Sequence, residues 1–124
     1  MIAIGIGCRL GCPASAIEAL VRQALDLAAS AGPARLFTIE DKAGESGLRL
    51  AADRLCMDLG FLSREVLAAQ SAFIRTRSEG AERRFGIPSV AEAAALSGSG
   101  AGSVLIVPRI TGMGATCAVA GPAS

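Results

Sequence analysis

The chain contains no histidine, tryptophan or tyrosine, and these absences exclude several kinds of function. Histidine is the commonest general base near neutral pH and the commonest metal ligand, so any proton transfer must use other side chains. Aromatic residues make up only 3% of the chain, which leaves little surface on which nucleobases could stack. A net charge of +1 also lacks the electrostatic footprint of a nucleic-acid-binding domain. We therefore expect no nucleic-acid partner.

Long hydrophobic runs are also missing. No apolar stretch approaches the roughly 20 residues that a membrane helix requires, so we expect no membrane association. Residues 1–7 are apolar, but they lack the basic segment of a signal peptide and run quickly into turn-forming residues. These features predict a cytoplasmic protein.

Cysteines are few, and their spacing is not that of a disulfide scaffold. Cys8, Cys12, Cys56 and Cys117 include no densely paired positions, so reduced thiols are expected. A closed zinc site needs four ligands, and without histidine the chain offers too few close together for zinc or an iron–sulfur cluster. We expect no metal and no cofactor. A minor hypothesis is that Cys12, near a helix N-terminus and Arg9, has a lowered pKa and is reactive.

Strand and helix patterns alternate along the 124 residues. Residues 15–18 form a capping-box pattern at the start of the first helix, and Gly32 and Pro33 would end that helix. Ser78 would cap a later helix. The patterns predict a single α/β domain over residues 1–124, with a mostly parallel or mixed sheet flanked by helices. Residues 71–78 allow no assignment, 97–102 are expected to be a loop, and 121–124 to fray. The strands are expected at 2–7, 35–40, 59–63, 104–108 and 115–120, and the later helices at 47–57, 64–69, 79–85 and 89–96.

The glycine-rich segment GIGCRLG at residues 5–11 follows the first predicted strand. It resembles a dinucleotide fingerprint only in part, because the third glycine is misplaced and the acidic residue comes late, so a nucleotide-binding domain is a remote alternative. The glycines alone would permit a tight strand-to-helix turn. A stronger interpretation is an anion site in which Arg9 and the N-terminus of the first helix act together, with Gly7, Cys8 and Gly11 alongside. The competing interpretation is that Arg9 is an ordinary solvated residue.

Charged residues crowd the end of the second predicted strand. In α/β domains substrate groups are met at the carboxyl ends of the strands, and the loops after Gly7 and Ile39 should share that edge. Lys42 would supply a cation there, and Glu45 or Asp41 a general base, although a solvated turn would also explain the pattern. The last glycine turn adds Arg109 as a second candidate cation.

Three segments together carry a family resemblance. Residues 5–11 and the helix after them are similar to an opening G-x-G-C-R-x-G turn, and residues 38–48 (TIEDKAGESGL) to a T-x-D-x-K-x-x-E-x-G-L stretch. Residues 88–96 (PSVAEAAAL) match an S-V-A-E-A-A-A-L helix, and residues 118–120 are close to a terminal strand. In this order and spacing, over about residues 2–120, the chain resembles the CobE and CbiG C-terminal-domain family of cobalamin-biosynthesis proteins.

The resemblance implies a role with a precorrin or corrin intermediate, whose acetate and propionate groups would meet Arg9, Lys42, Arg109 and Thr38. Larger family members open the lactone ring of cobalt-precorrin-5A, so a hydrolase-type step using Glu45 or Asp41 is the alternative to binding alone. The chain resembles the stand-alone members of the aerobic route. Other cobalamin-pathway enzymes would then be its protein partners. Whether the protein is an enzyme stays open at this point.

Overall fold

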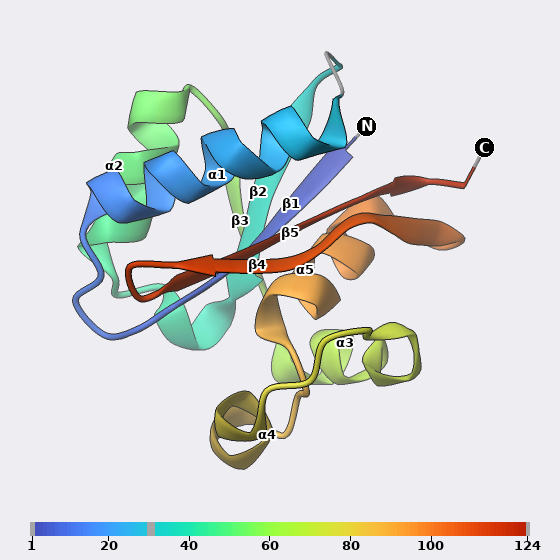
Figure 1. Cartoon of the computed structure of the whole chain (residues 1–124). Helices are drawn as coiled ribbons and strands as arrows, with labels where there is room; N and C mark the ends of the chain where they lie inside the picture. Colours follow the sequence, from blue (N-terminus) through green and yellow to red (C-terminus); the bar gives the residue numbers. More distant parts are fainter. Residues whose placement is uncertain (1, 30–31, 124) are drawn as a thin grey trace.

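The computed structural model describes residues 2–29 and 32–123. Within them, strands alternate with helices and two short 3-10 turns, η1 (Glu40–Lys42) and η2 (Ser71–Phe73) (Figure 1). The strands are β1 (Ile2–Cys8), β2 (Ala34–Ile39), β3 (Leu59–Leu62), β4 (Ser103–Gly112) and β5 (Ala115–Pro122). The helices are α1 (Ala14–Ala28), α2 (Ser46–Leu55), α3 (Arg64–Ala68), α4 (Glu79–Phe85) and α5 (Val90–Ser99).

The strands form one mixed sheet in the order β3-β2-β1-β5-β4. Strand β2 pairs in parallel with β1 and with β3, while β5 is antiparallel to both β1 and β4. The carboxyl ends of β1, β2 and β3 therefore lie at the same end of the sheet as the β4–β5 turn. The predicted α/β class with a mixed sheet flanked by helices is confirmed, and so is the shared edge of the loops after β1 and β2. No helix in the described part of the chain has the length and apolar character to span a bilayer.

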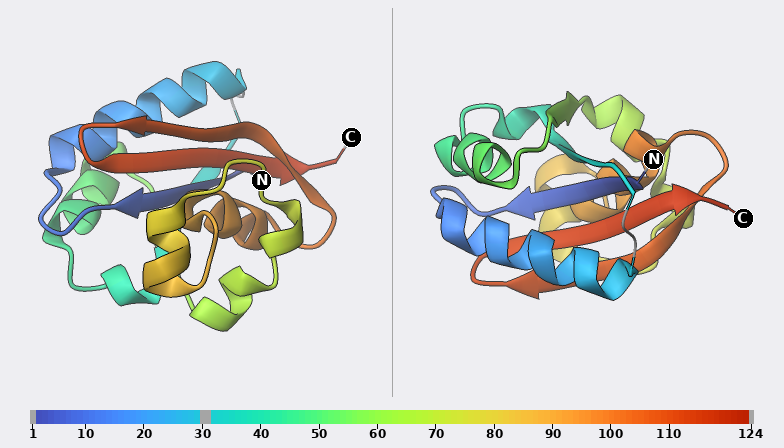
Figure 2. Two further views of the ribbon diagram at one scale, coloured as in Figure 1. Left: turned by 60° about the horizontal axis from the view of Figure 1, so that its bottom comes forward. Right: turned by 90° about the horizontal axis from the view of Figure 1, so that it is seen from above.

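Helices cover both faces of the sheet (Figures 1 and 2). Side chains alternate along a strand, so Ile2, Ile4 and Ile6 point to one face and pack with α1 and α2. Ala3 points to the opposite face, where α5 and α3 complete the core. Helix α5 is buried almost all round: each of residues 90–96 is less than 9% exposed.

The first two glycines of GIGCRLG are packing residues of β1, and the prediction that they permit a turn is wrong. A Cβ on Gly5 would overlap the carbonyl oxygen of Ala91, so α5 lies directly on the backbone of β1. A Cβ on Gly7 would lie 2.6 Å from the hydroxyl oxygen of Thr116 on β5. The turn itself depends on Gly11, whose φ of +73° is in the left-handed region that glycine adopts without strain.

The first helix begins and ends differently from the prediction. Its N-cap is Pro13, which makes no side-chain capping bond, so the expected capping box is not formed. Glu18 instead accepts a hydrogen bond from Arg22 one turn later. The helix ends at Ala29, a left-handed residue with φ of 51°, before Gly32 and Pro33 are reached. A local capping pattern was overridden because the chain enters α1 from a turn that is held by longer-range contacts.

Three other helices begin with a serine cap: α3 at Ser63, α4 at Ser78 and α5 at Ser89. The hydroxyl oxygen of Ser78 accepts the Ala81 N–H and so caps α4 as predicted, and that of Ser89 caps α5. The predicted loop at 97–102 is wrong in its first half, because residues 97–99 continue α5. The predicted fraying is wrong for residues 121 and 122, which belong to β5, whereas Ser124 lies outside the described residues.

A buried carboxylate connects α5 to two distant segments. Glu92 is fully buried, and its Oε1 accepts the backbone N–H groups of Arg75 (2.7 Å) and Thr76 (3.1 Å). Its Oε2 accepts the backbone N–H of Arg109 (2.8 Å), where the register of β4 is irregular. Both oxygens are thus satisfied by backbone donors, and one side chain joins the segment before α4 to strand β4.

Glu92→Gln should lower the free energy of unfolding by about 2–4 kcal/mol, because three charge-assisted bonds weaken and an amide N–H group then faces a backbone donor. The measurement is equilibrium urea unfolding. Glu65→Gln, at an exposed position on α3, is the matched control and should change stability by less than about 0.5 kcal/mol. Equal stability of wild type and Glu92→Gln would show that these bonds contribute nothing net.

Candidate functional site

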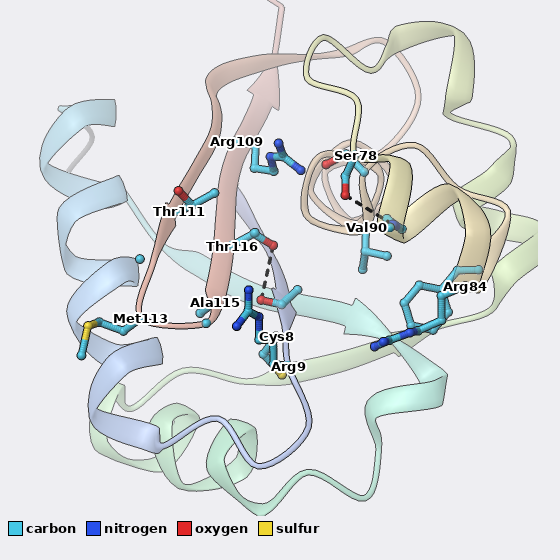
Figure 3. A pocket seen from close by; sticks show the side chains of 17 residues that line it. Cys8, Arg9, Ser78, Arg84, Val90, Arg109, Thr111, Met113, Ala115 and Thr116 are labelled. Atoms are coloured by element: carbon cyan, nitrogen blue, oxygen red, sulfur yellow. Dashed lines mark hydrogen bonds between the residues drawn. The ribbon is translucent and has the colours of Figure 1, made fainter.

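A pocket of about 540 Å³ opens at the edge where β1 ends and the β4–β5 turn begins (Figure 3). Its walls come from the end of β1, the β4–β5 hairpin, the start of α5 and helix α4. Sequence reasoning placed ligand contacts at this edge, and four of the predicted site residues line the pocket. They are Gly7, Cys8, Arg9 and Arg109.

Three arginines from three different elements surround this space. Arg9 follows β1, Arg109 belongs to β4, and Arg84 is on α4, and Figure 3 shows all three around the pocket. No aspartate or glutamate lines the pocket, and none of the three arginines forms an ion pair within the described residues. The Nε of Arg109 is buried and has no hydrogen-bond partner among the described residues. We call this space the cationic pocket.

Backbone contacts hold two of these arginines in place. The backbone N–H of Arg9 donates to the carbonyl oxygen of Gly114 (2.9 Å), which ties the loop after β1 to the β4–β5 turn. The aliphatic part of the Arg9 side chain runs past Gly114, where a Cβ would be 3.7 Å from its Cδ. Arg109 is positioned through its backbone N–H on Glu92. Arg84 is positioned by its own neighbour, because its guanidinium lies 5.9 Å from the centre of the Phe85 ring.

Most hydroxyl groups of the pocket have partners already. The Thr116 hydroxyl donates to the carbonyl oxygen of Gly7 (3.3 Å), and those of Ser78 and Ser89 cap α4 and α5. The arginines are therefore the main groups available to a ligand. The N-terminus of α5 also opens on the pocket at Val90, which adds the positive end of a helix dipole.

A second, smaller hollow of about 300 Å³ lies beside the first and contains two more predicted residues, Gly11 and Glu45. One carboxylate oxygen of Glu45 accepts the Gly11 N–H at 2.8 Å. Pro13 and Ala14, at the start of α1, line this hollow and not the cationic pocket. Arg9 and the N-terminus of α1 thus line different hollows, and the chain's own Glu45 lies beside the helix.

The remaining predicted residues line neither hollow. The Thr38 hydroxyl is buried and donates to the carbonyl oxygen of Ile6 (2.7 Å). Asp41 forms an ion pair with Arg64 (2.6 Å), whose hydrogen bond holds the pKa of that carboxyl below its usual range. Lys42 is only 9% exposed; its carbonyl oxygen accepts the Glu45 N–H, and its ammonium group has no hydrogen bond or ion pair with a described residue.

The hypothesis of a reactive Cys12 with a lowered pKa is wrong. Burial raises the pKa of this thiol and the nearby Glu45 carboxylate raises it further, against a smaller lowering effect of Lys42. Burial also raises the pKa of Cys8 to about 11 and that of Cys117 to about 12. At neutral pH these groups are thiols and poor nucleophiles. Among the described residues, no group of three or more cysteines and carboxylates is arranged to hold a metal ion.

Sequence reasoning missed Arg84, which comes from α4. Residues 79–85 carry no motif that links them to the sheet edge, and α4 contains no buried residue whose periodicity would orient it. Its place beside the pocket depends on the segment that Glu92 holds and on the Ser78 N–H, which donates to the Pro88 carbonyl oxygen (2.7 Å). Gly5, by contrast, is covered by α5 and is not available to a bound nucleotide.

Comparison with known proteins gives consistent results along the chain. A family model described as cobalamin synthesis G C-terminus matches residues 2–120. Protein CobE of a Sinorhizobium species is 34% identical over 125 residues, which cover 99% of this chain and 81% of that protein.

Two solved structures are similar in fold and in sequence. One is CobE, a protein from the cobalamin (vitamin B12) biosynthetic pathway, with a TM-score of 0.85 and 34% identity over 97% of this chain and 89% of that one. The other is the cobalamin biosynthesis protein chiG from Agrobacterium tumefaciens, with a TM-score of 0.74 and 32% identity over the full length of both chains. The chain therefore belongs to the CobE and CbiG C-terminal-domain family of cobalamin-biosynthesis proteins.

Proposed function

We propose that the chain binds a precorrin-type tetrapyrrole intermediate, and that the cationic pocket receives its carboxylate groups. The observation that carries the proposal is the buried Nε of Arg109, which has no partner in a pocket lined by three arginines and no carboxylate. An unpaired buried N–H group is costly, and an anionic ligand would remove that cost. The family's place in cobalamin biosynthesis supplies the class of ligand.

The arrangement of the cations suits a ligand with several carboxylates. Arg9, Arg84 and Arg109 come from separate elements, so each can meet a different acetate or propionate group. A guanidinium donates two parallel hydrogen bonds to one carboxylate, which orients the carboxylate as well as neutralising its charge. The N-terminus of α5 adds oriented N–H groups at the same place.

A hydrolase-type step, similar to lactone opening, would need a carboxylate that is free to activate water. Glu45 accepts the Gly11 N–H in the smaller hollow, and Asp41 is paired with Arg64. Neither lines the cationic pocket, so these contacts favour binding over catalysis there. The proposal includes a cytoplasmic location, and the four cysteines, none of which forms a disulfide, agree with it. It also includes transfer of the ligand to other cobalamin-pathway enzymes.

Arg109→Ala should weaken binding of uroporphyrin, a stable octacarboxylate tetrapyrrole, by about tenfold or more, because a charge-assisted bond to a shielded site is lost. Arg109→Lys should recover part of this loss, since the charge returns without the planar fork. The measurement is a fluorescence titration at low and high salt, in which salt should weaken wild-type binding more than that of Arg109→Ala.

Arg83→Ala is the matched control, because Arg83 is the exposed neighbour of Arg84 and does not line the pocket. Co-expression with the aerobic pathway enzymes, followed by mass analysis of any co-purifying pigment, identifies the natural ligand. Equal affinities of wild type and Arg109→Ala at low salt would refute the proposed pocket. If one equivalent of the protein changes the mass of many equivalents of the pigment, the protein is a catalyst and the binding proposal is replaced.

The raised thiol pKa values predict selective alkylation. At pH 8 only about one Cys8 side chain in a thousand would be a thiolate, whereas Cys56 is exposed. Iodoacetamide should modify a single thiol quickly, and Cys56→Ser should abolish this fast phase. Because the shift is upward, modification of Cys8 should accelerate only as the pH rises towards 11. A fast phase that persists in Cys56→Ser would contradict the assignment, and peptide mass mapping would show which thiol reacts.

A further inference from the structure

Two apolar side chains stand almost entirely in solvent at the border of the cationic pocket. Leu10 is 86% exposed in the loop after β1, and Met113 is 85% exposed in the β4–β5 turn. Met113 itself lines the pocket, and Leu10 follows Arg9, which lines it too. Figure 3 shows the Met113 side chain extending outward from the turn, away from the three arginines.

The two loops that carry these residues are joined to each other. The Arg9 N–H donates to the Gly114 carbonyl oxygen (2.9 Å), and the Cys12 thiol lies 3.8 Å from the carbonyl oxygen of Met113. Leu10 and Met113 are thus each next to a contact that connects the loops. We call this pair the apolar rim.

The backbone at Met113 gives a second, independent reason to assign a function to the rim. Met113 has φ of 54° and Gly114 has φ of 89°, as in the two-residue hairpin turns that favour Asn-Gly. A long unbranched side chain in this left-handed position is unusual. Since the Met113 side chain is exposed, the core gains nothing from it. Strain of this kind without a packing benefit is typical of residues that meet a ligand.

We infer that the apolar rim packs against the flat, apolar face of the ligand whose carboxylates enter the cationic pocket. This inference rests on the proposed binding function and adds a requirement to it: the ligand is amphiphilic, so a small polycarboxylate without a macrocycle is bound more weakly. A macrocycle whose edge carboxylates reach Arg9 and Arg109 would extend over the border of the pocket. There it meets two side chains whose burial removes apolar surface from water.

The rim differs from the other exposed apolar residues by its position. Leu27 on α1 is 57% exposed, and Phe73 in η2 is exposed as well, but neither lines the cationic pocket or adjoins in sequence a residue that does. Met113 lines the pocket and Leu10 follows Arg9, so the rim adjoins three arginines that have no ion pair among the described residues. That combination of apolar and positive surface is complementary to a polycarboxylate macrocycle.

The test compares two probes, uroporphyrin and citrate, on the full chain. Leu10→Ser and Met113→Asn should each weaken uroporphyrin binding by about fivefold or more, and change citrate binding by less than about twofold. Leu27→Ser is the matched control and should bind both probes like wild type. Met113→Asn suits the turn, so its thermal unfolding midpoint should equal or exceed that of wild type.

Unchanged uroporphyrin affinity in both rim variants would overturn the inference. An equal loss of citrate binding would also overturn it, since the variants would then act through the arginines. Wild type that binds neither probe would refute the proposed function and the inference together. Sedimentation velocity completes the test: if wild type associates with itself and the rim variants do not, the rim belongs to an interface between copies of the chain, which again overturns the assignment.

Discussion

The shape of the candidate site depends on one buried carboxylate, that of Glu92. It sits on α5, the helix in the middle of the molecule, and binds backbone N–H groups from the segment before α4 and from β4. Helix α4, which follows the first of these segments, carries Arg84, and β4 carries Arg109, so a single side chain connects two walls of the cationic pocket. The helix can hold this carboxylate so close to β4 because Gly5 lets α5 lie directly on β1. The geometry of the pocket therefore depends on close packing and on a buried carboxylate whose hydrogen bonds are satisfied, and not on a bound ligand.

The distribution of arginines separates structural roles from the proposed one. Arg22 and Arg64 are paired with Glu18 and Asp41, whereas the three arginines around the cationic pocket have no carboxylate partner among the described residues. Arg49, Arg75 and Arg83 also form no ion pair among the described residues, but they do not line the pocket. Exposed arginines often lack partners, but a buried Nε without one is rare, and this is why Arg109 carries more weight in the proposal than Arg9.

Periodicity and turn chemistry were enough to predict the α/β class, the sheet edge that holds the pocket, and the cap at Ser78, because these depend on residues close together in sequence. The role of Glu92 was not predictable in this way, since an acidic residue in the first turn of a helix is usually exposed, and its partners are 16 and 17 residues distant. Arg84 was missed for the same reason. The glycine motif misled because Gly5 packs against Ala91 on α5, a residue far away in the sequence, and the capping pattern at Ser15 was overridden by the turn at Pro13. Local signals thus predicted the elements, and long-range contacts decided which side chains share the site.

The chemistry of the pocket and that of its border point in the same direction. Thiols with raised pKa values offer no nucleophile, and the carboxylates proposed as bases are held by Gly11 and Arg64 outside the pocket. What remains available is unpaired positive charge next to the two exposed apolar side chains of the rim. Charge alone would attract any small anion, and apolar surface alone would attract any hydrophobic molecule. Only a ligand that has both properties gains from both surfaces at once, and a carboxylate-bearing macrocycle has both. The proposed selectivity of the site therefore depends on the contact between the two loops, which keeps Leu10 and Met113 at the border of the cationic pocket.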